Sequence, residues 1–124
     1  MSEEDYEAEL REAKSNLEAA QAKYDALKAK CEETEKIWRA AQEVTVKATQ
    51  DYNENSGGDS DLETYWRLRD EVQKAQLEED RTRDEYFETS REFQTAELEL
   101  NNAQLHYNDA ERDASNYRND ISRL

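Results

Sequence analysis

The sequence predicts an all-α fold in which two long helices form an antiparallel coiled-coil hairpin. Apolar and small residues recur every three or four positions through both halves of the chain, as the heptad pattern of paired helices requires. The chain has no proline, and its two glycines, Gly57 and Gly58, are adjacent near its middle. Residues 53–59 are all polar or glycine, which is typical of a turn. We therefore expect one helical hairpin spanning residues 1–124.

The first helix is expected at about residues 3–53. Ser2, just before the helix, and Asp5, in its first turn, are expected to form a capping box. A hydroxyl and a carboxylate three residues apart can bind the free N–H groups of a first turn. The residues expected to face the second helix are Tyr6, Leu10, Ala13, Leu17, Ala20, Tyr24, Leu27, Cys31, Thr34, Trp38, Ala41, Thr45, Ala48 and Tyr52.

A turn at about 54–60 precedes the second helix, expected at about 61–123. Ser60 and Glu63 form the capping box that opens it. The residues expected to face the first helix are Tyr65, Leu68, Val72, Ala75, Glu79, Thr82, Tyr86, Thr89, Phe93, Ala96, Leu100, Ala103, Tyr107, Ala110, Ala114, Tyr117, Ile121 and Leu124.

These two rows of residues, which we call the seam, complement each other in size when the helices run antiparallel, as a short connection requires. If paired residue numbers add to 120, most layers place a large side chain on a small one; Tyr24, for example, meets Ala96. Flanking charges support this register. Lys23 and Lys30 would bracket Glu92, and Glu35 would approach Arg83.

Glu79 interrupts the apolar seam and has two interpretations. Its carboxylate reaches water or pairs with Arg83 one turn later, which is the simpler interpretation. Alternatively, a charged residue close to Trp38 fixes the register or marks a place where the helices open to a partner.

A second apolar feature lies on the outer positions of the second helix. We call it the apolar strip, and most of its neighbours are uncharged amides. It predicts a homodimer built as a four-helix assembly; the alternatives are a foreign partner or no role in binding. The apolar strip comprises Trp66, Leu77, Phe87, Leu98 and Leu105. Ile37, Val44 and Val46 add apolar residues near the turn.

The other flank of the second helix carries a row of carboxylates, which we call the acidic flank. The whole chain has 32 acidic and 17 basic residues, giving a net charge of −15, which favours a basic protein partner and disfavours direct binding to nucleic acid or anionic lipid. The acidic flank comprises Glu71, Glu78, Glu85, Glu92, Glu99, Asp113 and Asp120.

Catalytic, metal and cofactor sites are not expected. His106 is the sole histidine and is expected to be a solvated flank residue, while Cys31 is expected to be a small buried group rather than a reactive thiol. One cysteine cannot form an internal disulfide, which fits a reducing compartment. No apolar run reaches the roughly 20 residues of a membrane span, and no signal peptide is recognisable, so a cytoplasmic protein is expected.

Three classes of non-catalytic protein fit these features. The first is an inhibitor or adaptor that binds a basic groove and partly imitates the phosphates of DNA. In composition alone, the chain resembles small, acidic, helical anti-defence proteins of phages, which implies action in the host cytoplasm. The second is a structural coiled coil, and the third is a helical-hairpin chaperone that uses the apolar strip. Charge reversal at Glu85, Glu92 and Glu99 should abolish binding in the first class, whereas Leu98→Glu with Phe87→Glu should split an assembly.

Overall fold

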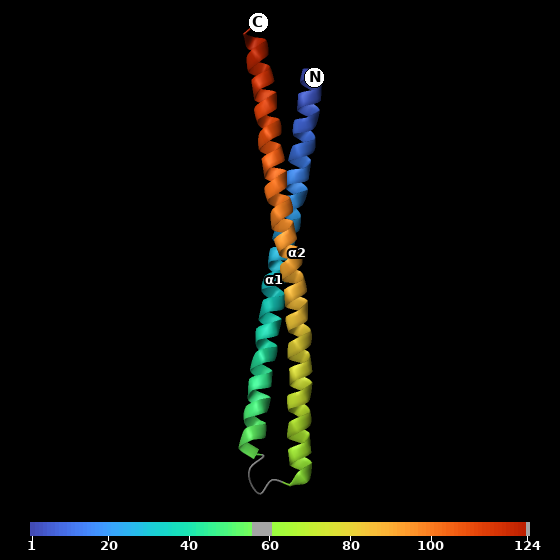
Figure 1. Ribbon diagram of the computed structural model, residues 1–124, viewed down its shortest axis with the longest axis vertical. Helices are drawn as coiled ribbons and strands as arrows, with labels where there is room; N and C mark the ends of the chain where they lie inside the picture. Colours follow the sequence, from blue (N-terminus) through green and yellow to red (C-terminus); the bar gives the residue numbers. More distant parts are fainter. Residues whose placement is uncertain (56–60, 124) are drawn as a thin grey trace. The chain divides into compact units, whose positions relative to one another are not determined.

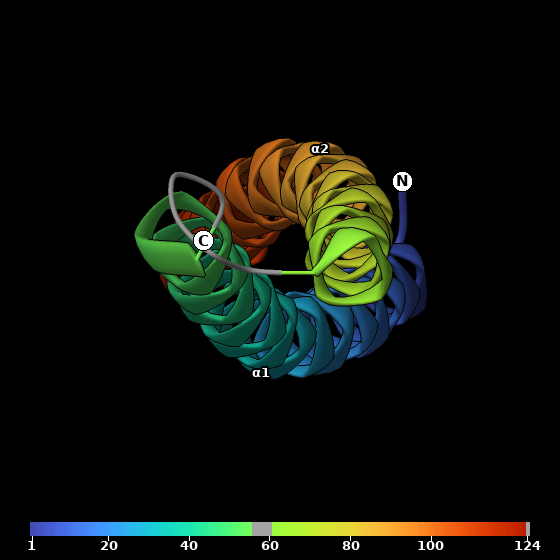
Figure 2. The ribbon, with the colours of Figure 1, turned by 90° about the horizontal axis from the view of Figure 1, so that it is seen from below.

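The computed structural model describes residues 1–55 and 61–123, which form two helices, α1 (Glu3–Asn55) and α2 (Leu62–Ser122). Of these described residues, 97% are helical and none belongs to a strand. The chain divides into two compact units: unit 1 comprises Met1–Lys28 and Glu92–Leu124, and unit 2 comprises Ala29–Arg91. Figures 1 and 2 show α1 beside α2 in each unit. The prediction of two helices packed against each other is confirmed.

The first turn of α1 is closed by the predicted capping box. The Ser2 N–H donates to Asp5 Oδ2 at 3.0 Å, and the Asp5 N–H donates to Ser2 Oγ at 3.3 Å. Two hydrogen bonds lower the pKa of the Asp5 carboxyl. The larger effect comes from the bond with the Ser2 backbone, and the smaller from the bond with the Ser2 side chain. The helix continues to Asn55, two residues beyond the predicted end.

The start of α2 differs from the prediction in the residue that caps it. Ser60 lies outside the described residues. Asp61 provides the cap, because its Oδ1 accepts the Thr64 N–H at 2.7 Å while its backbone oxygen accepts the Tyr65 N–H at 3.1 Å. The hydrogen bonds with Thr64 lower the pKa of the Asp61 carboxyl. Aspartate caps a helix as well as serine does, which explains why Asp61 can occupy this position.

The seam is buried mainly through small side chains. In unit 1, Ala13 and Ala96 are 0% and 1% exposed, and in unit 2, Thr82 is 1% exposed. All predicted seam residues up to Tyr117 are buried or half-buried. Ile121 is the exception, because it is 45% exposed, and Leu124 lies outside the described residues. Small side chains allow the two backbones to approach closely, which explains the high alanine content of the seam.

Aromatic contacts show that the helices are antiparallel in each unit. In unit 1, Tyr6 contacts Tyr117 with ring centroids 4.7 Å apart. Further along α1, Tyr24 contacts Phe93 at 5.0 Å. Residue numbers therefore rise along α1 as they fall along α2. The paired numbers add to 123 and 117, three residues, or about one helical turn, to either side of the predicted 120.

The same direction holds in unit 2, where two further aromatic pairs join the helices. Trp38 stacks on Tyr86 with centroids 5.4 Å apart, and Tyr52 contacts Tyr65 at 5.7 Å. The Tyr52 hydroxyl donates to the Tyr65 hydroxyl at 3.3 Å. These paired numbers add to 124 and 117, four and three residues from the predicted 120.

Threonine hydroxyls are accommodated in the seam by bonding to the preceding helical turn. Thr34 Oγ1 donates to the Cys31 carbonyl at 3.1 Å, and Thr82 Oγ1 donates to the Glu79 carbonyl at 2.9 Å. Such bonds satisfy a buried hydroxyl without a partner on the other helix. The seam can therefore contain polar residues without losing tight packing.

Candidate interaction surfaces

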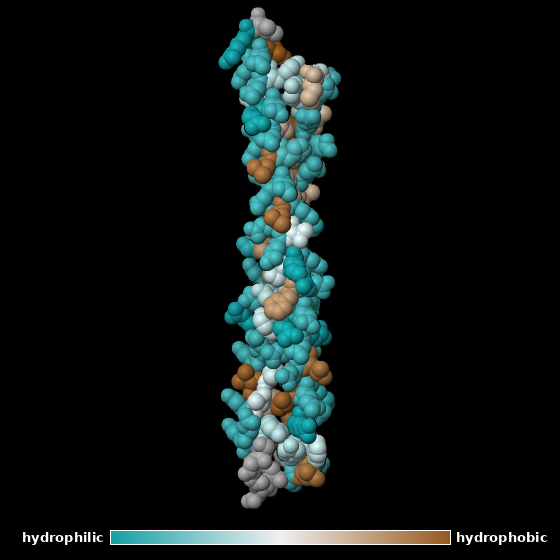
Figure 3. Space-filling model, in the orientation of Figure 1, coloured by the Kyte–Doolittle hydropathy of each residue, from teal (hydrophilic) through white to brown (hydrophobic). Residues whose placement is uncertain are grey.

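The apolar strip is exposed to solvent in both units. In unit 2, Trp66, Leu77 and Phe87 are 53%, 70% and 46% exposed; in unit 1, Leu98 and Leu105 are 65% and 61% exposed. The seam therefore buries none of these five side chains. Figure 3 shows apolar side chains as small separate patches within a hydrophilic surface.

Two members of the apolar strip have partners within the chain. Phe87 meets Trp38 edge to face at 5.6 Å between centroids, so it partly covers the seam of unit 2. The Arg69 guanidinium lies 5.3 Å from the centroid of the Trp66 ring, in a cation–π arrangement. This contact was not predicted from the sequence, although the i, i+3 spacing of the two residues allows it. The leucines are the more exposed part of the strip.

The acidic flank is exposed throughout, but several of its carboxylates have cationic neighbours. In unit 2, Arg81 bridges Glu78 and Glu85, with 3.6 Å to the latter. The Arg81 hydrogen bond lowers the pKa of Glu78. In unit 1, Lys23 donates to Glu99 at 3.0 Å. These pairs reduce the charge of the flank, so the row is less anionic than the sequence alone suggests.

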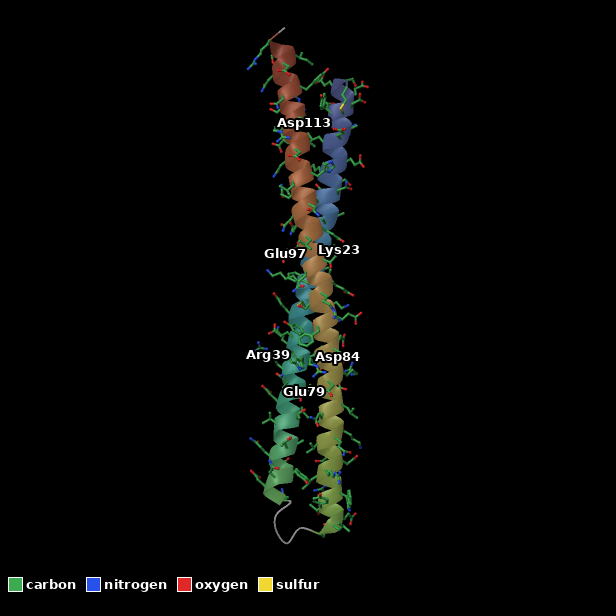
Figure 4. All side chains as sticks on the ribbon, viewed as in Figure 1. Lys23, Arg39, Glu79, Asp84, Glu97 and Asp113 are labelled. Atoms are coloured by element: carbon green, nitrogen blue, oxygen red, sulfur yellow. The ribbon has the colours of Figure 1, made fainter. Side chains whose placement is uncertain are left out.

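The negative charge is nevertheless large in each unit. Unit 1 contains fifteen acidic and seven basic residues, a net charge of −8, and unit 2 contains seventeen and ten, a net charge of −7. From Glu92 to Glu111 the chain has no lysine or arginine. Its carboxylates therefore pair with cations from α1 or from the end of the segment, as Lys23 does with Glu99 and Arg112 with Asp109 at 3.5 Å. Figure 4 labels Lys23 on α1 and Glu97 on α2 in this unit.

The Lys23 contact differs in detail from the prediction. Lys23 pairs with Glu99. Lys23 and Glu92 both line a surface groove of about 370 Å³, together with Ala26, Leu27 and Thr95. Lys30 belongs to unit 2, so its predicted approach to Glu92 is not described. Glu92 and Glu99 are one heptad apart, and the sequence did not indicate that the Lys23 side chain would reach Glu99 rather than Glu92.

Glu79 does not make its predicted ion pair. Arg83 pairs instead with Asp80 at 3.5 Å and Asp84 at 3.4 Å. Glu35, which was expected near Arg83, pairs with Arg39 at 2.7 Å. Among the described residues, Arg83 therefore forms an ion pair with neither Glu79 nor Glu35. That the Glu79 carboxylate reaches water, the other part of the simpler interpretation, stays a prediction. Figure 4 labels Arg39, Glu79 and Asp84 on their helices in unit 2.

A polar groove of about 540 Å³ in unit 2 is bordered by the half-buried Glu79 of α2 and by residues of α1. A second groove, of about 680 Å³, shares part of this border on the outer face of α1. Neither groove was predicted from the sequence, although both are lined by the uncharged amides Gln42 and Gln50 of α1. The α1 residues of the first groove are Gln42, Thr45, Val46, Thr49 and Gln50.

Cys31 and His106 occur in different units. Cys31 is a free, half-buried thiol of unit 2, and His106 is exposed in unit 1. Across residues 1–55 and 61–123, no group of three histidine, cysteine or carboxylate side chains is arranged to hold a metal ion. Neither described helix contains an apolar stretch long enough to cross a membrane.

Comparison with protein-family models, curated proteins and solved structures finds no significant match to this chain.

Proposed function

We propose that this chain is a non-catalytic interaction module that binds a basic surface of another protein through the acidic flank. The observation that supports this proposal is the exposure of all seven flank carboxylates on one helix. Even if all 17 basic residues paired with carboxylates, 15 of the 32 acidic residues would have no cation of this chain. A basic partner supplies that missing charge and is attracted over long range.

The proposed target surface is a basic groove that otherwise binds nucleic acid. Carboxylates seven residues apart on a helix are separated by roughly 10.5 Å along its axis, whereas duplex DNA carries one charge per about 1.7 Å. The acidic flank would thus imitate phosphate rows only in part. This role matches a phage-type inhibitor acting in the host cytoplasm, and the same charge opposes direct binding to nucleic acid or anionic membranes.

A peptide of ten lysines is a suitable probe, because it presents a basic surface without a fold of its own. The flank variant combines Glu71→Lys, Glu78→Lys and Glu85→Lys, and the control variant combines Glu32→Lys, Glu33→Lys and Glu43→Lys. All six glutamates are exposed in unit 2. Each triple reversal changes the net charge from −15 to −9, so only the position of the charge differs.

Calorimetric titration of the full chain with this peptide should show an about tenfold weaker affinity for the flank variant, since exposed charge contacts contribute a few tenths of a kcal/mol or more each. The control variant should lose at most about threefold. Circular dichroism should show equal helicity for both. Equal losses would mean that binding follows net charge alone, which contradicts a role for the flank.

Self-assembly is the second candidate function, and the exposure of the apolar strip favours it. A structural homodimer, in a four-helix arrangement, would cover leucines that the seam leaves in solvent. Leu77→Glu with Leu98→Glu is a better test than a change at Phe87, because Phe87 contacts Trp38. Light scattering should give twice 14.6 kDa for the native chain and 14.6 kDa for the variant. If the native chain is a dimer and the variant has the same mass, assembly through the apolar strip is excluded. If the native chain is itself a monomer, the apolar strip remains exposed and could bind a foreign client.

A further inference from the structure

All seven tyrosines of the chain are half-buried, but their rings differ in what they contact. In unit 2, Tyr52 of α1 and Tyr65 of α2 contact each other, with centroids 5.7 Å apart and ring planes 48° apart. By contrast, Tyr24 in unit 1 contacts Phe93, which has no hydroxyl. Burial therefore does not distinguish Tyr52 and Tyr65 from the other tyrosines, whereas their contact with each other does.

The rings of Tyr52 and Tyr65 converge toward their hydroxyl ends. The Tyr52 hydroxyl donates to the Tyr65 hydroxyl at 3.3 Å, a shorter distance than the 5.7 Å between the ring centroids. The ortho carbons lie at this end of each ring, next to the carbon that bears the hydroxyl. Tyrosyl radicals couple through these carbons, because their unpaired electron is shared between the oxygen and the ortho carbons. The reactive edges of the two rings therefore face each other.

We propose that Tyr52 and Tyr65 form an oxidative modification site, at which hydrogen peroxide, activated by a haem peroxidase, couples the two side chains into dityrosine. Each phenol loses one electron and one proton and becomes a tyrosyl radical, and a carbon–carbon bond then forms between two ortho carbons. Each of these carbons loses its hydrogen as a proton, and each oxygen regains one. The pair thus loses two hydrogen atoms in all, which reduce one hydrogen peroxide to two waters.

The contact between the rings favours coupling within one chain. At a low chain concentration a radical on another tyrosine must meet its partner by diffusion, whereas Tyr52 and Tyr65 already lie together. The torsion that rotates a tyrosine ring has a broad energy minimum, so a small rotation brings the ortho carbons closer without moving the helices.

The new bond joins the end of α1 to the start of α2. Tyr52 lies in the last turn of α1, which ends at Asn55, and Tyr65 lies in the first turn of α2, which begins at Leu62 (Figure 1). Coupling closes a ring of fourteen residues, from 52 to 65. A cross-link over a short segment restricts the unfolded chain, so the coupled chain should unfold at a higher temperature.

The test uses the full chain with Tyr6→Phe, which removes the hydroxyl of the other tyrosine contact in the described part of the chain, that of Tyr6 with Tyr117. This chain is treated with hydrogen peroxide and a haem peroxidase at low micromolar concentration. Trypsin then releases residues 48–67 as one peptide that contains both Tyr52 and Tyr65. The coupled peptide should weigh two hydrogen atoms less and show dityrosine fluorescence. Further cleavage at aspartates should leave the two tyrosine segments joined.

Two single changes in this background separate the site from general oxidation. Tyr52→Phe and Tyr24→Phe each remove one hydroxyl from a half-buried tyrosine and keep its ring. Tyr52→Phe should lower the yield of the lighter peptide at least about tenfold, whereas Tyr24→Phe should change it less than about twofold. Circular dichroism should show equal helicity for both variants. Equal losses in the two variants would contradict the inference.

A free tyrosine derivative, N-acetyltyrosinamide, shows under the same conditions that the oxidant is active. If this compound couples while residues 48–67 keep their mass, the inference is wrong. It is also wrong if dityrosine occurs only in chains of doubled mass on a reducing, denaturing gel, because coupling is then between chains.

Thermal unfolding tests the effect of the bond on the chain. The coupled chain should unfold about 5 °C or more above the equally treated Tyr52→Phe variant. Equal unfolding midpoints would contradict the inferred joining of the helix ends.

Discussion

Trp38 of α1 lies on Tyr86 of α2 with the planes of the two rings 23° apart. In unit 2 this stack is joined by Phe87, whose ring meets Trp38 edge to face. The indole N–H of Trp38 is buried and donates to no atom of the described residues. The contribution of Trp38 is therefore that of its apolar surface, reduced by the cost of an unpaired donor.

Replacement of Trp38 by alanine should lower the free energy of unfolding by about 3 kcal/mol, because a large side chain is lost from the seam. Trp38→Phe should cost less, since it also removes the unpaired donor. The control Trp66→Ala, at a side chain 53% exposed, should cost about 0.5 kcal/mol or less. Urea unfolding followed at 222 nm measures all three. Equal costs at the two tryptophans would show that the stack does not stabilise the hairpin.

The Lys23–Glu99 ion pair should contribute little, because the two side chains are 55% and 48% exposed. A double-mutant cycle with Lys23→Gln and Glu99→Gln should give a coupling free energy of about 0.2–1 kcal/mol. The coupling should fall in 1 M salt, where the charges are screened. A salt-independent coupling above this range would mean that the pair is more desolvated than its exposure indicates.

The tight packing of alanines in unit 1 can be tested by adding volume. Ala96 is 1% exposed, so Ala96→Leu should destabilise the chain by about 1–3 kcal/mol through overpacking. The exposed Ala22 is a matched control in the same unit, and Ala22→Leu should change stability by less than about 0.5 kcal/mol. Thermal unfolding distinguishes the two. A tolerated leucine at Ala96 would show that the helices are farther apart than described.

The Asp61 cap should make the start of α2 sensitive to acid. Because the hydrogen bonds with Thr64 lower the pKa of Asp61 in the folded chain, its stabilising effect is present above the ordinary aspartate pKa of about 3.9. The effect is lost as the pH falls through the lower folded-state pKa. Asp61→Asn keeps an acceptor oxygen but does not titrate.

The informative quantity is the difference in urea midpoint between the native chain and Asp61→Asn from pH 6 to pH 2. Below about pH 4, the urea midpoint of the native chain should fall relative to that of Asp61→Asn. A difference that stays constant across this range would mean that the Asp61 carboxylate does not cap the folded helix.

The sequence predicted the seam because heptad spacing depends only on the period of the helix, and burial then follows for residues as different as Tyr6 and Thr89. It also indicated the Ser2–Asp5 cap, since both partners lie in one turn. Side-chain pairing was less predictable. Glu35 has Arg39 four residues away on its own helix, and such a local pair forms at a lower entropic cost than one between helices.

The candidate surfaces were predicted only as positions. Heptad spacing placed the apolar strip and the acidic flank outside the seam, and the exposure of Leu77 and Glu71 agrees with this. The bridging of Glu78 and Glu85 by Arg81 depends on rotamers that the heptad pattern does not specify. The groove beside Glu79 likewise results from side-chain directions on both helices.

The central claim is that the position of the acidic flank, rather than net charge, directs binding to a basic surface. The most direct test is the ratio of dissociation constants of the flank and control variants for the ten-lysine peptide, measured at low salt and at 0.5 M salt. We predict that the flank variant binds several times more weakly than the control at low salt, and that the ratio approaches one as salt screens the charges. A ratio of one at both salt concentrations would contradict the account.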